Sequence, residues 1–107
     1  MKRAISLAVC LTAFAAAPSA QDLASKGKDV YTAQKCAVCH SIAGVGNKRG
    51  ALEGVGAKLS TDDIRQWITN APEMTAKIKS ERKPPMKSFT LAKDDLDALV
   101  AYLQTLK

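Results

Sequence analysis

The sequence predicts a small all-α domain. Apolar residues recur at helical spacing in several segments, and polar capping residues stand at the start of at least one of them. No segment shows convincing strand alternation or a hairpin turn, and the sequence contains no internal repeat. A length of 107 residues fits one domain.

The first 20 residues are expected to be a signal peptide, which leaves residues 21–107 as the domain. Two basic residues follow Met1, and Ala4 to Ala17 form an apolar run of 14 residues. Small residues then lead to Ala20, in the layout of a secretory signal. The run is too short to span a bilayer comfortably as a helix. Cleavage one residue before this point is the alternative.

The first helix of the domain is predicted from Asp22 to Lys35. One face of this helix is shared by Leu23, Gly27, Val30, Tyr31 and Gln34. Gly27 lies in mid-helix, where glycine costs roughly 1 kcal/mol relative to alanine. We therefore expect another helix to approach the backbone closely at Gly27, with a tolerated surface glycine as the alternative.

A loop is predicted from Ser41 to Lys58, because this segment holds five of the six glycines. It does not fit a phosphate-binding loop, since no apolar strand precedes it and no Lys-Ser or Lys-Thr pair closes it. A second helix is expected to begin near Ser60, with Asp63 in the position of a capping box.

Pro72 interrupts the second helix, and Met74 to Lys79 are expected to form a short further helix. Ser80 to Thr90 is polar and contains prolines, which predicts a loop. The last helix is predicted from Lys93 to Leu106. Its regular apolar stripe consists of Leu96, Leu99, Val100, Leu103 and Leu106.

The pentapeptide from Cys36 to His40, Cys-Ala-Val-Cys-His, has the spacing of a c-type haem attachment site. On a helical turn, positions i, i+3 and i+4 share one face, so Cys36, Cys39 and His40 can meet one ligand. Each thiol can form a thioether with a haem vinyl group, and His40 then serves as the proximal iron ligand.

A disulfide, a zinc site or a thiol-redox site would account for the Cys36–His40 segment less completely than a haem does. A disulfide between Cys36 and Cys39 would close only a very small loop and leaves His40 without a role. Zinc prefers four ligands, and the domain offers only Cys36, Cys39 and His40 as soft candidates. A thioredoxin-like site requires a βαβ context, which the sequence lacks.

The second axial ligand is predicted to be Met86. His40 is the only histidine, so ligation by two histidines of one chain is excluded. Met86 follows Pro84 and Pro85, which restrict the backbone. Met74 lies in a helical context and is expected to pack in the core, while an open or lysine-ligated iron is the remaining alternative. Ligation by His and Met favours ferrous iron.

Together these features resemble the class I c-type cytochromes, which are small monohaem electron carriers. The residues that carry the resemblance are Gly27 with Tyr31, Cys36 to His40, Leu52 to Gly56, Trp67, Pro85-Met86 and Leu99 to Leu103. The resemblance implies a cytochrome c fold, in which three to four helices pack around one covalently bound haem c. It also implies that the first and last helices cross near Gly27 and Tyr102, and that Trp67 lies close to a haem propionate, with ordinary core packing as the alternative for Trp67.

One segment departs from the family pattern. The family often has a proline after a glycine in the loop that follows the histidine, and the carbonyl there accepts a hydrogen bond from the ligand imidazole. The segment from Lys48 to Leu52 has no proline. A carbonyl of Gly50 or Ala51 is expected to take over this role in orienting His40.

The charge is mildly basic. The chain has 16 Lys and Arg against 10 Asp and Glu, and without the two basic residues at its start the net charge is +4. This is too little for a typical nucleic-acid binder. Basic residues near the haem-bearing segments are expected to dock acidic redox partners, with simple solubility as the alternative. These residues are Lys35, Lys48, Arg49, Lys83 and Lys87.

The function implied by the resemblance is that of a non-enzymatic electron carrier in the periplasm. It would pass single electrons from respiratory or dehydrogenase donors to a terminal oxidase or reductase, without stable membrane insertion. The first alternative is a dedicated haem subunit of one periplasmic enzyme complex. A gas-binding or peroxidatic haem protein is a further alternative that requires an open iron position, and Met86 argues against it.

Overall fold

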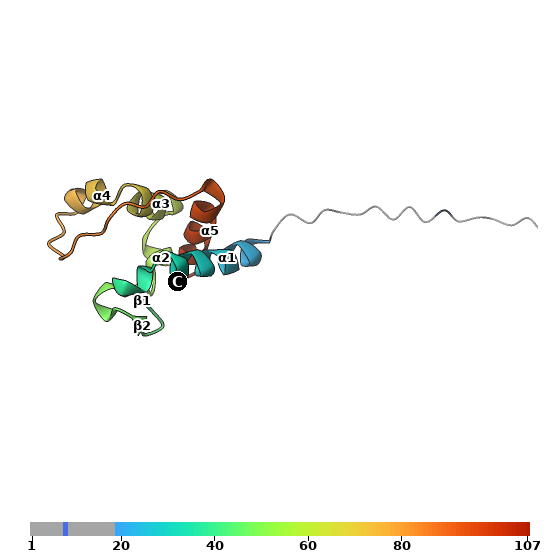
Figure 1. Ribbon diagram of the computed structural model, residues 1–107, viewed down its shortest axis with the longest axis horizontal. Helices are drawn as coiled ribbons and strands as arrows, with labels where there is room; N and C mark the ends of the chain where they lie inside the picture. The colour runs from blue at the N-terminus through green and yellow to red at the C-terminus, as the bar shows by residue number, and fades with distance from the viewer. Residues whose placement is uncertain (1–7, 9–18) are drawn as a thin grey trace, which may run out of the picture.

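The computed structural model describes residue 8 and residues 19–107. Nearly all of the expected signal peptide, residues 1–20, lies outside the described residues. The elements, in chain order, are α1 (Ala20–Ala33), the 3₁₀ turn η1 (Cys36–Val38), β1 (Ser41–Ile42), β2 (Val45–Gly46), the 3₁₀ turn η2 (Lys48–Gly50), α2 (Val55–Lys58), α3 (Thr61–Thr69), α4 (Ala71–Lys77) and α5 (Lys93–Gln104) (Figure 1). The predicted all-α class is confirmed.

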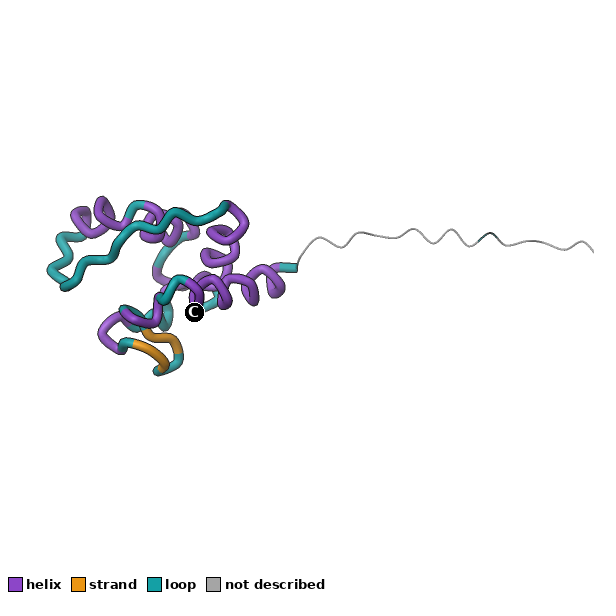
Figure 2. Tube along the Cα trace, in the orientation of Figure 1, coloured by secondary structure: helices purple, strands orange, loops and turns teal. Residues whose placement is uncertain are grey.

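The first and last helices of the domain, α1 and α5, cross and pack against each other (Figures 1 and 2). α3 and α4 lie on one side of this pair, and the irregular segment from residue 78 to 92 returns alongside them to α5. The buried core is contributed by α1, α3 and α5, and its members are Val30, Tyr31, Ile64, Ile68, Leu99, Val100 and Leu103.

The crossing of α1 and α5 is centred on Gly27, as expected. A Cβ atom built on Gly27 would overlap the Ala98 carbonyl and lie 2.6 Å from the Tyr102 Cβ. Next to this contact the rings of Tyr31 and Tyr102 pack edge to face, with centroids 5.9 Å apart. The cost of glycine in mid-helix is therefore offset by the close approach of two backbones.

The bounds of α1 differ from the predicted range of Asp22 to Lys35. The helix begins earlier because Ser19 and Asp22 form a capping box. The Ser19 hydroxyl accepts from the Asp22 amide at 3.2 Å, and the Asp22 carboxylate accepts from the Ser19 amide at 3.4 Å. The helix ends at Ala33 because Lys35 adopts a left-handed conformation with φ of 56°.

The segment from Ser41 to Lys58 is more ordered than the predicted loop. It contains a two-stranded antiparallel hairpin, in which Ser41 faces Gly46 and Ile42 faces Val45. Its turn residues, Ala43 and Gly44, both have positive φ values, 52° and 79°. The prediction that no hairpin occurs was wrong because alanine stands where Asn or Asp usually signals such a turn.

The later helices follow their predicted signals with shifted ends. The Ser60 hydroxyl caps α3 by accepting from the Asp63 amide at 3.1 Å. α4 begins at Ala71 rather than Met74, because Pro72 occupies its first turn, where proline needs no amide hydrogen. α5 ends at Gln104 instead of Leu106. Residues 80–92 form neither helix nor strand, and they include the loop predicted from Ser80 to Thr90.

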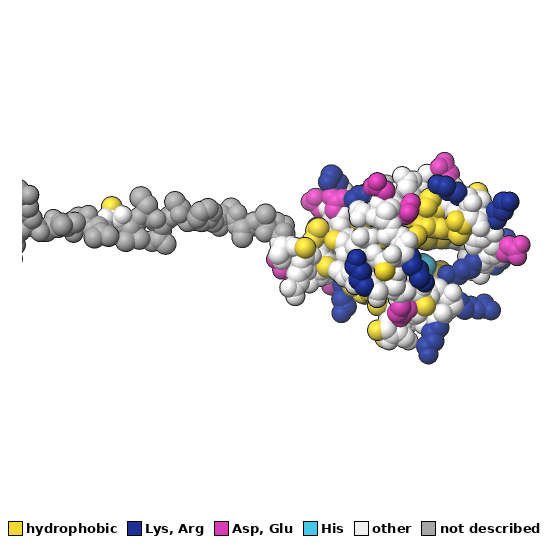
Figure 3. Space-filling view, turned by 180° about the vertical axis from the view of Figure 1, so that it is seen from behind, with side chains coloured by type: hydrophobic (Ala, Val, Ile, Leu, Met, Phe, Trp, Pro, Cys, Tyr) yellow, Lys and Arg dark blue, Asp and Glu magenta, His cyan; other side chains and the backbone are white. Residues whose placement is uncertain are grey.

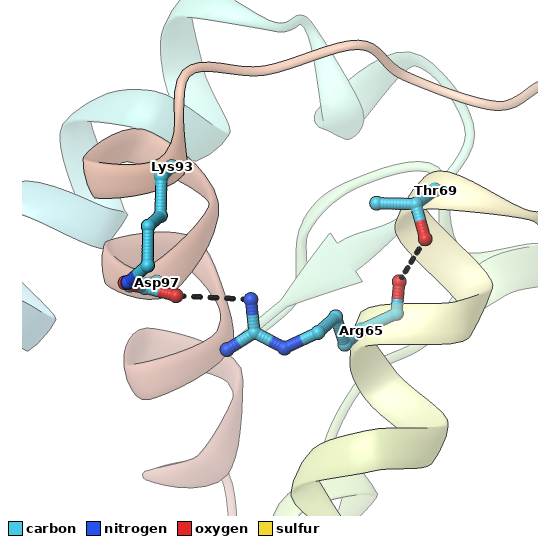
Figure 4. A network of polar contacts seen from close by, with 4 residues as sticks. All are labelled: Arg65, Thr69, Lys93 and Asp97. Atoms are coloured by element: carbon cyan, nitrogen blue, oxygen red, sulfur yellow. Dashed lines mark hydrogen bonds and ion pairs between the residues drawn. The ribbon is translucent and has the colours of Figure 1, made fainter.

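An ion-pair network joins α3 to α5 (Figure 4). The Asp97 carboxylate lies 2.9 Å from the guanidinium of Arg65, which belongs to α3. It lies 2.6 Å from the ammonium group of Lys93, which belongs to the same helix as Asp97. The hydrogen bonds from Lys93 and Arg65 lower the pKa of Asp97 below its usual value, so it is ionised at neutral pH. The Arg65–Asp97 pair links two helices that carry the core residues Ile64 and Leu99.

Candidate functional site

A largely apolar cavity of about 300 Å³ lies between the α1–α5 pair and the segments from α3 to residue 89. The helices α1 to α5, the η1 turn with the segment that follows it, and the irregular segment before α5 contribute to its walls. The lining residues are Tyr31, Gln34, Cys36, His40, Leu52, Val55, Leu59, Ile64, Trp67, Ile68, Thr75, Ile78, Ser80, Arg82, Pro85, Met86, Phe89, Leu99 and Leu103. Its size and apolar lining are typical of cofactor pockets.

The Cys-x-x-Cys-His segment forms a helical turn against this cavity. The amides of Cys39 and His40 both donate to the Cys36 carbonyl, at 3.1 and 2.9 Å. Cys36 and His40 line the cavity, whereas Cys39 is exposed and lines an adjacent hollow. The structure therefore gathers the predicted haem-binding residues at one corner of the domain.

The orientation of His40 is set by a backbone carbonyl. Its Nδ1 lies 2.9 Å from the Gly50 carbonyl oxygen, one of the two acceptors expected. Burial lowers the pKa of His40, so the ring is neutral at pH 7. A neutral ring that donates from Nδ1 carries its lone pair on Nε2, the form that a metal-ligating imidazole needs.

The loop that supplies this carbonyl is held in place without a proline. Gly50 is buried, and its amide donates to the Asn47 carbonyl at 3.1 Å. The Leu52 amide donates to the Ser41 carbonyl at 2.9 Å, which ties the loop to the hairpin. The missing proline is thus replaced by backbone hydrogen bonds on both sides of Gly50.

The two methionines of the domain have different positions. Met86 lines the cavity together with His40, although the two residues are 46 positions apart in the sequence. Met74 lies in α4, is half-buried and does not contribute to the cavity walls. The arrangement agrees with Met86 as the predicted ligand, and ligation itself stays a prediction.

The cysteines do not have the features of a thiol-redox or zinc site. Cys36 and Cys39 carry free thiols. Burial raises the pKa of the Cys36 thiol, whereas reactive redox cysteines have lowered pKa values. Among residues 8 and 19–107, three or more His, Cys, Asp or Glu side chains nowhere come together as a metal-binding group.

A haem fits the residues that are present. His40 and Met86 offer one imidazole and one thioether, an axial ligand pair typical of c-type cytochromes. Cys36 lines the same cavity, and the remaining lining is mostly aliphatic and aromatic. Trp67 is part of this lining and is half-buried, and its place beside a haem propionate stays a prediction.

The buried hydroxyl of Tyr31 has no hydrogen-bond partner within the described part of the chain. Burial, the largest cause, raises its pKa from 10.0 to about 12. The folded protein therefore holds this proton more tightly than the unfolded chain does. The resulting contribution to stability is complete below pH 10 and is lost as the pH rises toward about 12.

Replacing Tyr31 by phenylalanine should remove this pH dependence. We expect the free energy of unfolding of the unmutated protein to fall relative to Tyr31→Phe between pH 10 and pH 12. Below pH 9 the difference between the two proteins should be constant. Urea unfolding at a series of pH values measures this difference, and a difference that is flat up to pH 12 would contradict the raised pKa.

Arg82 is a charged residue of the site that was not predicted. Arg82 lines the cavity and also the adjacent hollow, whose other lining residues are Val38, Cys39, Asn47, Arg49, Lys83 and Pro84. The sequence offered no signal that separates Arg82 from its neighbour Lys83. Only the fold shows that the Arg82 guanidinium reaches the Cys39 carbonyl.

Comparison with known proteins agrees with these features. The family model described as cytochrome c matches residues 24–107. The chain is 26% identical over 96 residues to "Cytochrome c oxidase subunit 2" of Alkalihalophilus pseudofirmus, which covers 81% of this chain and 27% of that protein. It is 31% identical over 90 residues to "Cysteine--tRNA ligase" of Paracoccus denitrificans, covering 83% of this chain and 19% of that protein.

The chain thus spans about a quarter and a fifth of the lengths of these two curated relatives. Their whole-protein activities do not follow for this chain from such partial matches. No solved structure matches the chain significantly.

Proposed function

Because the chain belongs to the cytochrome c family, we propose that it is a periplasmic single-electron carrier with one haem c, ligated by His40 and Met86. Thioether links from Cys36 and Cys39 would hold the haem, which supplies a one-electron ferric–ferrous couple. The observation that supports this proposal most is the shared cavity of His40 and Met86. Family membership indicates an electron carrier, and the proposal adds that the chain catalyses no reaction of its own.

The side chains around the cavity suit this role. His40 is held as a neutral donor by Gly50, and the thioether of Met86 is also neutral. Two neutral ligands in an apolar site favour the less charged ferrous iron and raise the reduction potential. If His40 and Met86 both ligated the iron, a substrate would find no open iron position, which would disfavour gas binding and peroxidatic chemistry.

Anaerobic redox titration followed by visible spectroscopy tests the proposal. We expect a single transition that fits one electron per chain. We also expect the reduced protein to remain unchanged under carbon monoxide. Rapid carbon monoxide binding by the unmutated protein would contradict the assignment of Met86.

A basic surface beside the site supports docking of acidic redox partners. Lys35, Lys48, Arg49, Lys83 and Lys87, the residues predicted for docking, are all exposed. Figure 3 shows Lys and Arg side chains at the end of the domain that carries α4 and the following loop, beside an apolar area. Val38, with 69% of its surface exposed, lies in the same hollow as Arg49 and Lys83. Such a surface attracts acidic proteins at a distance and offers apolar contact on docking.

Charge reversal at Arg49 should change reaction rates with small charged oxidants in opposite directions. We expect Arg49→Glu to slow oxidation of the ferrous protein by hexacyanoferrate(III) several-fold at low salt, and to accelerate oxidation by tris(phenanthroline)cobalt(III). Added salt should shrink both effects. Stopped-flow rate constants provide the measurement.

Lys28→Glu is the matched control, because it makes the same charge change at an exposed position of α1. The docking surface would be wrongly placed if Lys28→Glu altered both rates as much as Arg49→Glu.

A dedicated haem subunit of one enzyme complex is the second candidate. The similarity to part of a cytochrome c oxidase subunit 2 favours it, since that protein's name describes an enzyme subunit. None of the helices within the described residues is long and apolar enough to cross a membrane. Salt-sensitive reaction with several partners would support the carrier, whereas co-purification with one dehydrogenase or oxidase would support the subunit.

A further inference from the structure

Arg82 connects the segment that carries Met86 to the corner that carries His40. Its guanidinium donates a hydrogen bond to the Cys39 carbonyl, across 43 positions of sequence. Cys39 directly precedes His40, and Arg82 lies four residues before Met86. The Arg82 side chain thus connects the two segments that contain the proposed ligands His40 and Met86.

Gly50 lies against the same guanidinium. A Cβ atom at Gly50 would come within 2.6 Å of the terminal nitrogens of Arg82 and would also overlap the Cys39 carbonyl. The carbonyl of this glycine accepts the hydrogen bond from His40 Nδ1. The absence of a side chain at position 50 therefore leaves room for Arg82 beside the residue that orients His40.

The Met86 segment has few other polar attachments. Among the hydrogen bonds of the described residues, residues 81–87 reach another part of the domain only through the Arg82 guanidinium, apart from a bond to the neighbouring Ser80. After Met86 the chain is anchored again, because Ser88 accepts from the Ala71 amide at 3.1 Å and the Phe89 amide donates to the Ile68 carbonyl at 2.8 Å. Before Met86, Arg82 is the corresponding anchor.

We infer that Arg82 is a positioning residue, which straps the Met86 segment to the Cys39–Gly50 corner and so limits how often the Met86 sulfur leaves the iron. This inference rests on the proposed ligation by His40 and Met86. Arginine suits the role because its planar, permanently charged guanidinium donates strongly to a carbonyl.

Displacement of Met86 by imidazole measures how firmly Arg82 holds the Met86 segment in place. Imidazole binds ferric iron only when the Met86 sulfur has moved away, so its apparent affinity follows the population of the open segment. Loss of one charge-assisted hydrogen bond should raise that population about tenfold. We therefore expect Arg82→Gln to bind imidazole about tenfold more tightly than the unmutated protein, while still showing the far-red sulfur-to-iron absorption band without imidazole.

Two further variants separate positioning from general effects. Arg82→Lys keeps the charge and a donor group, and should bind imidazole more weakly than Arg82→Gln does. Lys79→Gln removes a nearby exposed charge outside residues 81–87 and should bind imidazole like the unmutated protein.

The possible outcomes distinguish the strap from the ligation on which it rests. An Arg82→Gln protein with an imidazole affinity within twofold of the unmutated protein, or matched by Lys79→Gln, would overturn the strap alone. An unmutated ferric protein without a sulfur-to-iron band would overturn the proposed Met86 ligation, and the strap with it.

Discussion

Replacing Met86 by alanine is expected to abolish the far-red sulfur-to-ferric-iron absorption band and to create a site that binds carbon monoxide. Met86 lines the same cavity as Cys36 and His40, and no other methionine does so within the described chain. Without the thioether, the iron loses its sixth ligand and the preference for the ferrous state weakens. The reduction potential should therefore fall.

Met74→Ala serves as the matched control, since it deletes the same side chain from a half-buried position of α4 away from the cavity. We expect it to keep the absorption band and to remain inert to carbon monoxide, with only a modest loss of stability. Visible spectra under argon and under carbon monoxide compare both variants. If Met74→Ala lost the band and Met86→Ala kept it, the ligand assignment would be reversed.

Replacing Gly27 by valine is expected to destabilise the domain by about 3 kcal/mol, the upper end of the range for overpacked cores. The first added carbon would already overlap the Ala98 carbonyl, which is backbone and does not rotate away. The helices α1 and α5 would have to separate at their closest point. For a domain of this size, the midpoint of thermal unfolding should fall by at least about 10 °C.

Lys28→Val provides the comparison, because it places the same β-branched residue at the next, exposed position of α1. It should cost well under about 1 kcal/mol, the range of helix propensities. Thermal unfolding followed by circular dichroism measures both variants. Equal midpoints for the two proteins would show that the helix crossing does not depend on Gly27.

The helices were predictable because their signals are local. The apolar stripe of the last helix and the cap at Ser60 each depend on neighbouring residues, and both were found with ends displaced by only a few positions. Gly27 was predictable as a crossing point because a glycine in mid-helix is costly without a close contact. The start of α1 was missed because Ser19 was assigned to the signal peptide.

The features that were missed depend on contacts between residues distant in the sequence, or on a residue type that is unusual for its backbone conformation. The hairpin turn places alanine at a positive φ, so its sequence does not resemble a turn. Arg82 looks like any other basic loop residue until the fold brings it to Cys39 and Gly50. The carbonyl that accepts the hydrogen bond from His40 could be predicted only as that of Gly50 or Ala51. Which of two adjacent carbonyls faces the ring depends on the path of the loop.

The central claim is that Cys36, Cys39 and His40 hold one haem in this domain. The most direct measurement is the visible spectrum of the exported protein, purified from a cell that matures c-type haem, together with alkylation of its unfolded chain. We predict one haem per chain, a reduced c-type spectrum, and no reaction of alkylating reagent at Cys36 or Cys39. A colourless protein in which both thiols are alkylated would contradict the claim.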